Sequence, residues 1–292
     1  MKKFAVIGDS TCDLRQDTRE QLGIDYFMMN VVFNDLEKKA DLDWKEYSAK
    51  ELYDNMRNKQ RVKTTQVPME EFVRVFEKHL SEGEDVVYIS CSSALSGSIN
   101  VASAAVEELK EKYKDAKIVL FDSKISCLGQ GMMLIEAATM RNNGATIEEV
   151  EKRLEEMRDN INQFCVPESL LYLKNAGRVK ASTAFFGNLI GIKPILVSSL
   201  EGENVAIEKV KGRKSSLNRI VELASNAIAN PKDSVVYVAH SDCEEDANYV
   251  VNLIKEKIQP KDVYVNILGP IIGASVGPGT VAIYVEGTKK TI

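Results

Sequence analysis

The chain has 292 residues, of which 44% are hydrophobic and 28% charged, and its formal net charge is −5. This length is natural for two domains, and the composition is that of an ordinary globular protein. Basic residues are scattered along the chain, which argues against nucleic acid as a partner because neutralising phosphates requires a basic surface.

Four segments share one pattern, in which a short β-branched run precedes a small polar loop and then helical periodicity. The apolar runs are 4–7, 86–89, 118–121 and 235–239. Near-continuous apolar strands that alternate with helices indicate a parallel sheet covered on both faces. Helices are predicted at 44–59, 68–81, 99–114, 130–142, 146–160, 214–229 and 243–258. Thr146 and Glu149 form a capping-box signature at the start of the helix 146–160.

The pattern changes after residue 160. Residues 163–166 predict a short strand closed by Pro167, and 167–192 is rich in helix and loop. Apolar runs at 194–198, at 205–207 and near the C-terminus predict a second sheet. We therefore predict an α/β fold with two α/β domains. The first, 1–163, has a largely parallel sheet flanked by helices, and the second is 164–292.

Targeting signals and cysteine usage indicate the compartment. The uncharged stretch 263–285 is long enough to span a bilayer, but Pro270, Pro278 and four glycines would break such a helix, so we predict strand, loop and strand. The N-terminal apolar run is too short for a signal peptide. Five cysteines without a C-x-x-C pair indicate free thiols, and no Cys/His set has zinc-ligand spacing. We expect a cytoplasmic protein with no metal site and no membrane-spanning segment, and transient contact with a membrane surface stays open.

A serine-rich loop is the most informative polar segment. In an open α/β sheet, ligands bind beyond the carboxyl ends of the strands, and the loop 90–98 follows such an end. It carries five serines and Gly97. The helix after it offers free N–H groups and the positive end of its dipole to an anion. Serines are also common caps and turn residues, so the pattern alone leaves both interpretations open.

Two further segments could complete an anion site. Thr64, Thr65 and Gln66 precede a predicted helix, where they could hold an anion or cap the helix. Arg178 follows Gly177 and suits bidentate recognition of a carboxylate or phosphate, although a surface arginine is equally expected at a helix end.

Other polar groups near strand ends are interpreted as structural. Asp9 and Asp13 suit an Asx-turn and a helix cap. His240 is assigned no role, and Cys91 and Cys127 are interpreted as small packing residues.

Together, these motifs resemble the DegV family along essentially the whole chain. The resemblance rests, in chain order, on 9–14, 64–66, 92–97, 122–123, 171–173 leading to Gly177 and Arg178, 191–196, and Gly273 with 277–279. It implies a carrier without a cofactor that binds a long-chain fatty acid between its two domains. In members that act with a bacterial fatty-acid kinase, the acid is presented to a separate kinase subunit, which uses ATP to make the acyl phosphate.

The resemblance also implies roles for individual residues. Thr64, Thr65, Ser93 and Ser96, with the Gly97 N–H, would contact the carboxylate. Ser275 stands where the family usually carries a histidine, and it can donate a hydrogen bond but offers no imidazole. Arg178 would lie near the head group or the kinase interface. Residues 164–292 would close the lipid pocket. Predicted walls of a tail tunnel are Phe27, Met28, Met29, Met132, Met133, Phe185, Phe186, Leu189, Ile190 and Ile195.

The alternative function is a stand-alone enzyme acting on a small anionic or acyl substrate. A phosphotransferase should show a G-x-x-x-x-G-K-[ST] loop or a G-x-G-x-x-G that opens a helix, and neither is present. A hydrolase needs a nucleophile elbow, which the turn at 95–97 does not match. The sequence therefore favours a lipid-binding carrier over an enzyme.

Overall fold

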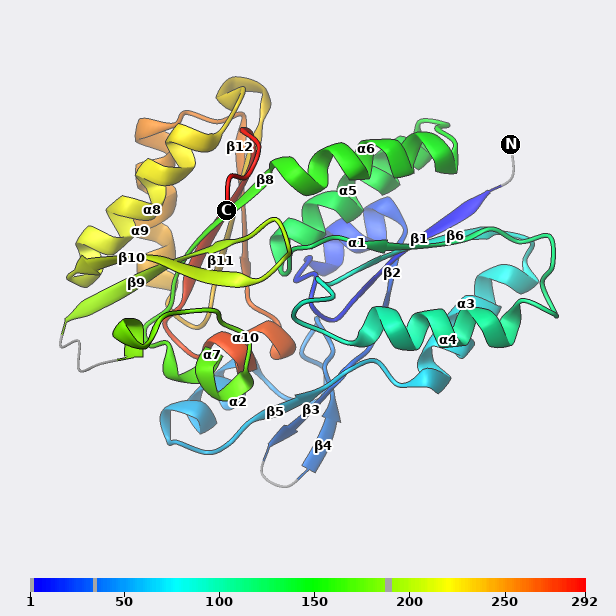
Figure 1. The fold of residues 1–292 in the computed structure, drawn as a ribbon, viewed down its shortest axis with the longest axis horizontal. Coiled ribbons are helices and arrows are strands. Elements are labelled where there is room, and N and C mark those ends of the chain that lie inside the picture. Colours follow the sequence, from blue (N-terminus) through cyan, green and yellow to red (C-terminus); the bar gives the residue numbers. More distant parts are fainter. Residues whose placement is uncertain (1–2, 34–35, 187–190) are drawn as a thin grey trace.

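The computed structural model describes residues 3–33, 36–186 and 191–292, and their strands form three sheets (Figure 1). The helices are α1 (Gln16–Leu22), α2 (Ala49–Arg57), α3 (Met69–Ser81), α4 (Ser98–Leu109), α5 (Leu128–Asn142), α6 (Ile147–Asn160), α7 (Leu171–Ala176), α8 (Arg213–Ala227), α9 (Glu244–Lys257) and α10 (Pro270–Val276). The strands are β1 (Phe4–Asp9), β2 (Ile24–Phe27), β3 (Asn30–Phe33), β4 (Leu36–Lys39), β5 (Lys63–Thr65), β6 (Asp85–Ser90), β7 (Ile118–Asp122), β8 (Ile161–Val166), β9 (Ile192–Ser198), β10 (Asn204–Lys211), β11 (Val235–His240), β12 (Asp262–Ile267) and β13 (Val281–Glu286).

The first sheet has the order β2-β1-β6-β7, and all its pairs run parallel. Side chains alternate between its faces along each strand. Val6 of β1 packs in the cluster that contains α5 and α6, whereas Ile7 packs in the cluster that contains α3 and α4. Burial on both faces explains the near-continuous apolar runs, and the predicted parallel sheet flanked by helices is confirmed.

The second sheet has the order β10-β9-β8-β13-β11-β12 and is mixed. Only the β11–β12 pair is parallel among the pairs that the structure describes. Helices α8 and α9 cover one face, and the other face turns toward α5 and the first sheet (Figure 1). The predicted α/β class is confirmed. The boundary predicted between residues 163 and 164 falls inside β8.

A third, small sheet was not predicted. Strands β4, β3 and β5 pair antiparallel, and β5 holds Thr64 opposite Val31 and Thr65 opposite Asn30. Both threonines were predicted only to precede a helix, where they could hold an anion or cap it. A strand of only three residues forms because β3 lies beside it, and no local pattern shows that.

The segment 263–285 contains β12 and β13, as predicted, but the stretch between them forms α10 rather than a loop. Pro270 opens this helix, where its missing N–H would have no partner anyway, and Gly277 ends it at a φ of 79°. Each predicted helix is present, and the capping box of Thr146 and Glu149 is confirmed. Helix α1 was not predicted, whereas α7 lies in the segment 167–192 that was predicted to be rich in helix and loop. No helix in the described ranges is long and apolar enough to cross a membrane.

Candidate ligand-binding site

A cavity of about 230 Å³ lies between the loops of the first sheet, the small sheet, α10 and the second sheet. The part of the lining that is accessible from outside is called here the outer end, and it is largely polar. It is formed by Thr64, Thr65, Gln66, Ser96, Gly97, Arg178 and Ser275. These residues are half-buried or exposed. The buried walls, called here the inner walls, include Cys165, Leu173, Leu196, Ile271, Ala282 and Tyr284.

The serine-rich loop is ordered against the end of β5. Ser96 Oγ donates to Ser98 Oγ at 3.1 Å, and the N–H of Val67 donates to Ser98 Oγ at 3.3 Å. Ser98 is 1% exposed, so this buried contact holds the serine-rich loop against the segment that follows β5. It brings the hydroxyls of the serine loop and of β5 to the same end of the cavity.

Gly97 lies close to the side chain of Gln66. A Cβ atom at Gly97 would lie 2.7 Å from Gln66 Oε1, so a larger residue would displace the amide. Gly97 is also the N-cap of α4, whose first-turn N–H groups and positive dipole end therefore lie beside the cavity lining.

Arg178 lies at the rim of the outer end. It follows Gly177, which ends α7 at a φ of 69°. Arg178 Nε donates to the carbonyl oxygen of Leu95 at 3.0 Å, and Nη1 donates to the carbonyl oxygen of Ala176. The side chain is exposed, and Leu95 belongs to the serine loop. The arginine thus brings a positive charge beside the hydroxyls.

Ser275 lies within α10, and its Oγ donates to the carbonyl oxygen of Ile271 at 3.1 Å. Residues 273–277 read Gly-Ala-Ser-Val-Gly, a match to the G-x-S-x-G pattern of hydrolases that the sequence analysis overlooked. A nucleophile elbow requires a sharp strand-to-helix turn, whereas Ser275 sits in the last turn of a helix. The match is therefore one of sequence alone.

The inner walls follow the period of the strands. Ala282 pairs with Cys165 and Tyr284 with Gln163, and all four line the cavity from adjacent strands β13 and β8. Leu196 lines it from β9, so its neighbour Ile195 faces the opposite way and packs in the cluster under α8.

Several residues predicted for the site lie elsewhere. Ser93 is exposed, and its Oγ donates to Asp122 Oδ2 at 2.5 Å, away from the cavity lining. Phe27 makes a tilted contact with Phe72 and edge-to-face contacts with Phe76 and Tyr88 in the core of the first domain.

The predicted tunnel walls have mixed outcomes. Met29 lines the cavity. Met28 is half-buried, Met132 and Met133 are core residues of the cluster under α5, and Phe185 packs against that cluster. Leu189, Ile190 and the side chain of Phe186 lie outside the described residues.

Other lining residues were missed. They include Thr11, Cys91, Leu95, Ser126, Gln163, Asn204, Leu268, Ile272, Val276 and Thr280. A usable signal existed for one of them, because Gln163 is a polar residue inside a short apolar strand. The others come together only when the two sheets meet.

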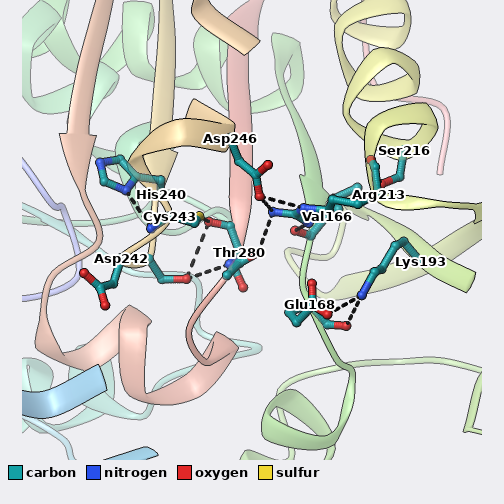
Figure 2. A network of polar contacts seen from close by, with 12 residues as sticks. Val166, Glu168, Lys193, Arg213, Ser216, His240, Asp242, Cys243, Asp246 and Thr280 are labelled. Atoms are coloured by element: carbon teal, nitrogen blue, oxygen red, sulfur yellow. Dashed lines mark hydrogen bonds and ion pairs between the residues drawn. The ribbon is translucent and has the colours of Figure 1, made fainter. Parts of the chain in front are cut away.

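A polar network braces the wall behind the cavity (Figure 2). Arg213, at the start of α8, donates to the carbonyl oxygens of Gly279 at 2.6 Å and Val166 at 3.3 Å, and to Asp246 Oδ2 at 2.9 Å. These bonds hold the glycine–proline loop against the end of β8, beside the lining residue Thr280. Sequence analysis did not identify Arg213.

The histidine and thiols near the site are structural. His240 Nδ1 accepts a hydrogen bond from the N–H of Cys243 at 3.4 Å, and burial lowers the pKa of His240 (Figure 2). Burial raises the pKa of the Cys91 and Cys127 thiols, which keeps them protonated and weakly nucleophilic. Within the described residues, no group of three His, Cys, Asp or Glu side chains could hold a metal ion.

Comparison with known proteins defines the family. The family model described as "Uncharacterised protein, DegV family" matches residues 3–288. The chain belongs to the DegV family. A DegV domain-containing protein of Clostridium perfringens is 36% identical over 290 residues, which cover 99% of each chain.

Solved DegV structures share the whole fold. A DegV family protein from Thermus thermophilus, described by its fatty-acid binding, is 27% identical with a TM-score of 0.87, covering 98% of this chain and 100% of that one. DegV from Bacillus subtilis, described as a fatty acid binding protein, is 29% identical with a TM-score of 0.81, covering 99% and 100%.

Proposed function

We propose that this DegV protein is a carrier that binds one long-chain fatty acid, with the carboxylate at the outer end of the cavity and the tail along the inner walls. The observation that carries the proposal is a cavity whose accessible lining carries hydroxyl groups and whose buried lining is mostly apolar. An amphipathic ligand needs this division, because its charged end requires hydrogen bonds and its chain gains from burial. The binding ascribed to the relatives from Thermus and Bacillus adds support.

The outer end offers donors that suit a carboxylate. Thr64, Thr65 and Ser96 supply hydroxyls, and the Gly97 N–H lies at the start of α4, where the helix dipole favours an anion. Ser275 would add a hydroxyl from α10 once this hydroxyl turns from the carbonyl oxygen of Ile271 to the carboxylate. Arg178 completes the set with a positive charge at the rim.

The tail supplies most of the binding energy. Burying roughly 15 methylenes at about 0.8 kcal/mol each contributes on the order of 12 kcal/mol before the costs of ordering the ligand. The head-group donors then need only prevent the carboxylate from being left without hydrogen bonds.

A separate fatty-acid kinase would receive the presented carboxylate. The outer-end side chains are half-buried or exposed, so a partner enzyme could reach a head group held there. Mixing the loaded protein with ATP and a bacterial fatty-acid kinase subunit should yield acyl phosphate only when both proteins are present. Turnover by this chain alone would instead favour the stand-alone enzyme. Against that alternative, the nearby thiols are protonated and Ser275 is engaged with its own helix.

The deciding experiment is mass spectrometry of an organic extract from the purified, undenatured protein. We expect about one fatty acid per chain, and we expect the double variant Thr64→Ala, Ser96→Ala to bind added fatty acid roughly 10- to 100-fold more weakly, because each hydroxyl bonds a charged group. The matched control is Thr139→Ala, Ser81→Ala, which removes exposed hydroxyls outside the cavity lining.

The outcomes separate the two parts of the proposal. A native protein that carries no fatty acid and takes up none would exclude the carrier function. Unchanged affinity in the Thr64, Ser96 variant would leave the function standing but place the head group elsewhere.

A further inference from the structure

The inner part of the cavity contains a polar group that an alkyl chain cannot satisfy. Gln163 lines the cavity from β8 and is 4% exposed. Its Nε2 donates to Asn204 Oδ1 at 3.0 Å, and Asn204 Nδ2 donates to the carbonyl oxygen of Arg178 at 3.1 Å. These bonds orient the amide. Gln163 Oε1 accepts no hydrogen bond from the residues that the structure describes.

This amide lies several residues from Ser275 along β13 and β8, although Asn204 connects it to the backbone of Arg178. Thr280 Oγ1 donates to the carbonyl oxygen of Val276 at 3.2 Å, so the start of β13 adjoins α10, which carries Ser275. Along β13 the lining continues with Ala282 and then Tyr284, and Gln163 is the partner of Tyr284 on β8. At about 3.3 Å per residue, four residues separate Thr280 from Tyr284 by roughly 13 Å.

A second polar side chain, this one with a hydroxyl group, faces the same cavity. Ser126 is 6% exposed and lines the cavity from the loop before α5. Its Oγ likewise makes no hydrogen bond within the described part of the chain, where only its carbonyl oxygen accepts one, from Gly129. Two nearly buried polar side chains among apolar walls therefore retain hydrogen-bonding capacity toward the cavity.

We propose that Gln163 forms a second polar subsite that selects an oxygenated fatty acid, one bearing a hydroxyl group partway along its chain. The hydroxyl would donate to Gln163 Oε1. A bound alkyl chain would cover the amide oxygen without giving it a hydrogen bond, which is unfavourable, so a site of this kind discriminates against the analogue that lacks the hydroxyl. This subsite rests on the proposed function, because it assumes that the chain lies along the inner walls.

The test is competitive binding of octadecanoic acid and a panel of its hydroxylated isomers, with the hydroxyl at successive positions from carbon 6 to carbon 14. The delipidated full-length protein is used with a fluorescent fatty acid as the displaced probe. We expect one position to bind at least roughly fivefold more tightly than octadecanoic acid, as one net hydrogen bond would produce.

A substitution at Gln163 tests whether its amide causes the preference for the hydroxylated isomer. Gln163→Met keeps the length and flexibility of the side chain and removes both polar atoms. We expect it to lose the preference for the hydroxylated isomer while binding octadecanoic acid at least as tightly. The matched control is Gln16→Met, which makes the same change at an exposed position on α1.

Three results have defined meanings. The subsite is excluded if the wild-type protein binds octadecanoic acid as tightly as every isomer, a comparison that does not depend on the variant folding. It is also excluded if Gln163→Met weakens plain and hydroxylated acids equally. Failure of the wild-type protein to bind any acid would reject the proposed function itself.

Discussion

Asp13 is completely buried between the first loop and the start of α10. Its Oδ1 accepts a hydrogen bond from the N–H of Gly269 at 2.9 Å, whereas Oδ2 has no hydrogen-bond partner among the described residues. Desolvation raises the pKa of this carboxyl from 3.8 to about 8. The folded protein therefore keeps a proton that the unfolded chain releases, and this group makes the protein less stable as the pH rises from 3.8 to about 8.

Replacing Asp13 by Asn should remove that dependence. Asn keeps an acceptor for Gly269 and does not ionise. Between pH 5 and pH 8, the free energy of unfolding of Asp13→Asn should rise relative to the wild type by up to about 4 kcal/mol, since each pH unit corresponds to about 1.4 kcal/mol. Urea unfolding at several pH values measures the difference. Parallel pH profiles for the two proteins would contradict the perturbed carboxyl.

At the scale of secondary-structure elements, α8 acts as a brace for the loop beside the cavity. Arg213 joins this helix to the end of β8, to α9 and to the carbonyl oxygen of Gly279 (Figure 2). Arg219, on the same helix, pairs only with Glu208 and Glu222 among the described residues. Replacing each arginine in turn therefore compares the bonds that Arg213 makes to the loop beside the cavity with the ordinary surface ion pairs of Arg219.

We expect Arg213→Met to lower the free energy of unfolding by about 2–4 kcal/mol, because part-buried carbonyl oxygens and a carboxylate lose a charged donor. Arg219→Met should lower it by about 1 kcal/mol or less. Chemical denaturation measures both, and limited proteolysis should cut the segment 277–280 faster only in Arg213→Met. Equal effects of the two substitutions would show that Arg213 is not a brace.

Whether a helix or strand could be predicted from the sequence depends on whether its pattern lies within its own residues. Helix periodicity in α3 or α6 lies in the residues themselves, since apolar side chains recur at the helical period and Thr146 with Glu149 marks the start of α6. Strand β5 has no such pattern. It exists because β3 lies beside it, and it carries two of the proposed head-group threonines.

Across the whole molecule, the cavity is shared by both domains. Direct bonds also join them: Arg57 pairs with Asp242 at 2.5 Å, and the Tyr53 hydroxyl donates to the carbonyl oxygen of Leu268 at 2.8 Å. A ligand in this cavity would contact β5 and the serine loop on one side and β8, β13 and α10 on the other.

Fatty acid should therefore protect both sides together. At a ligand concentration of 100 Kd, mass action adds about 2.7 kcal/mol of stability. Hydrogen exchange followed by mass spectrometry should show slower exchange in 63–67 and 91–101 as well as in 268–284, with little change in α9, which packs on the far face of the second sheet. Protection confined to one domain would mean that the ligand does not lie between them.

The sequence by itself determined the family, the α/β class and the parallel first sheet, because these depend on motifs and on periodicities carried by neighbouring residues. It also indicated the outer-end residues Thr64, Thr65, Ser96, Gly97 and Arg178, whose hydroxyls, backbone and charge follow recognisable motifs.

Only the tertiary structure decided which apolar residues line the cavity. Met132 and Ile195 are as hydrophobic as Met29 and Leu196, yet the first two pack into cores and the last two face the cavity. Hydrophobicity predicts that a side chain will be buried. The face of the sheet on which it is buried depends on the strand register and on how two sheets meet. Gln163 is a polar residue in a largely apolar segment of the sequence, but only the meeting of the sheets shows that its amide lies in the wall of the cavity.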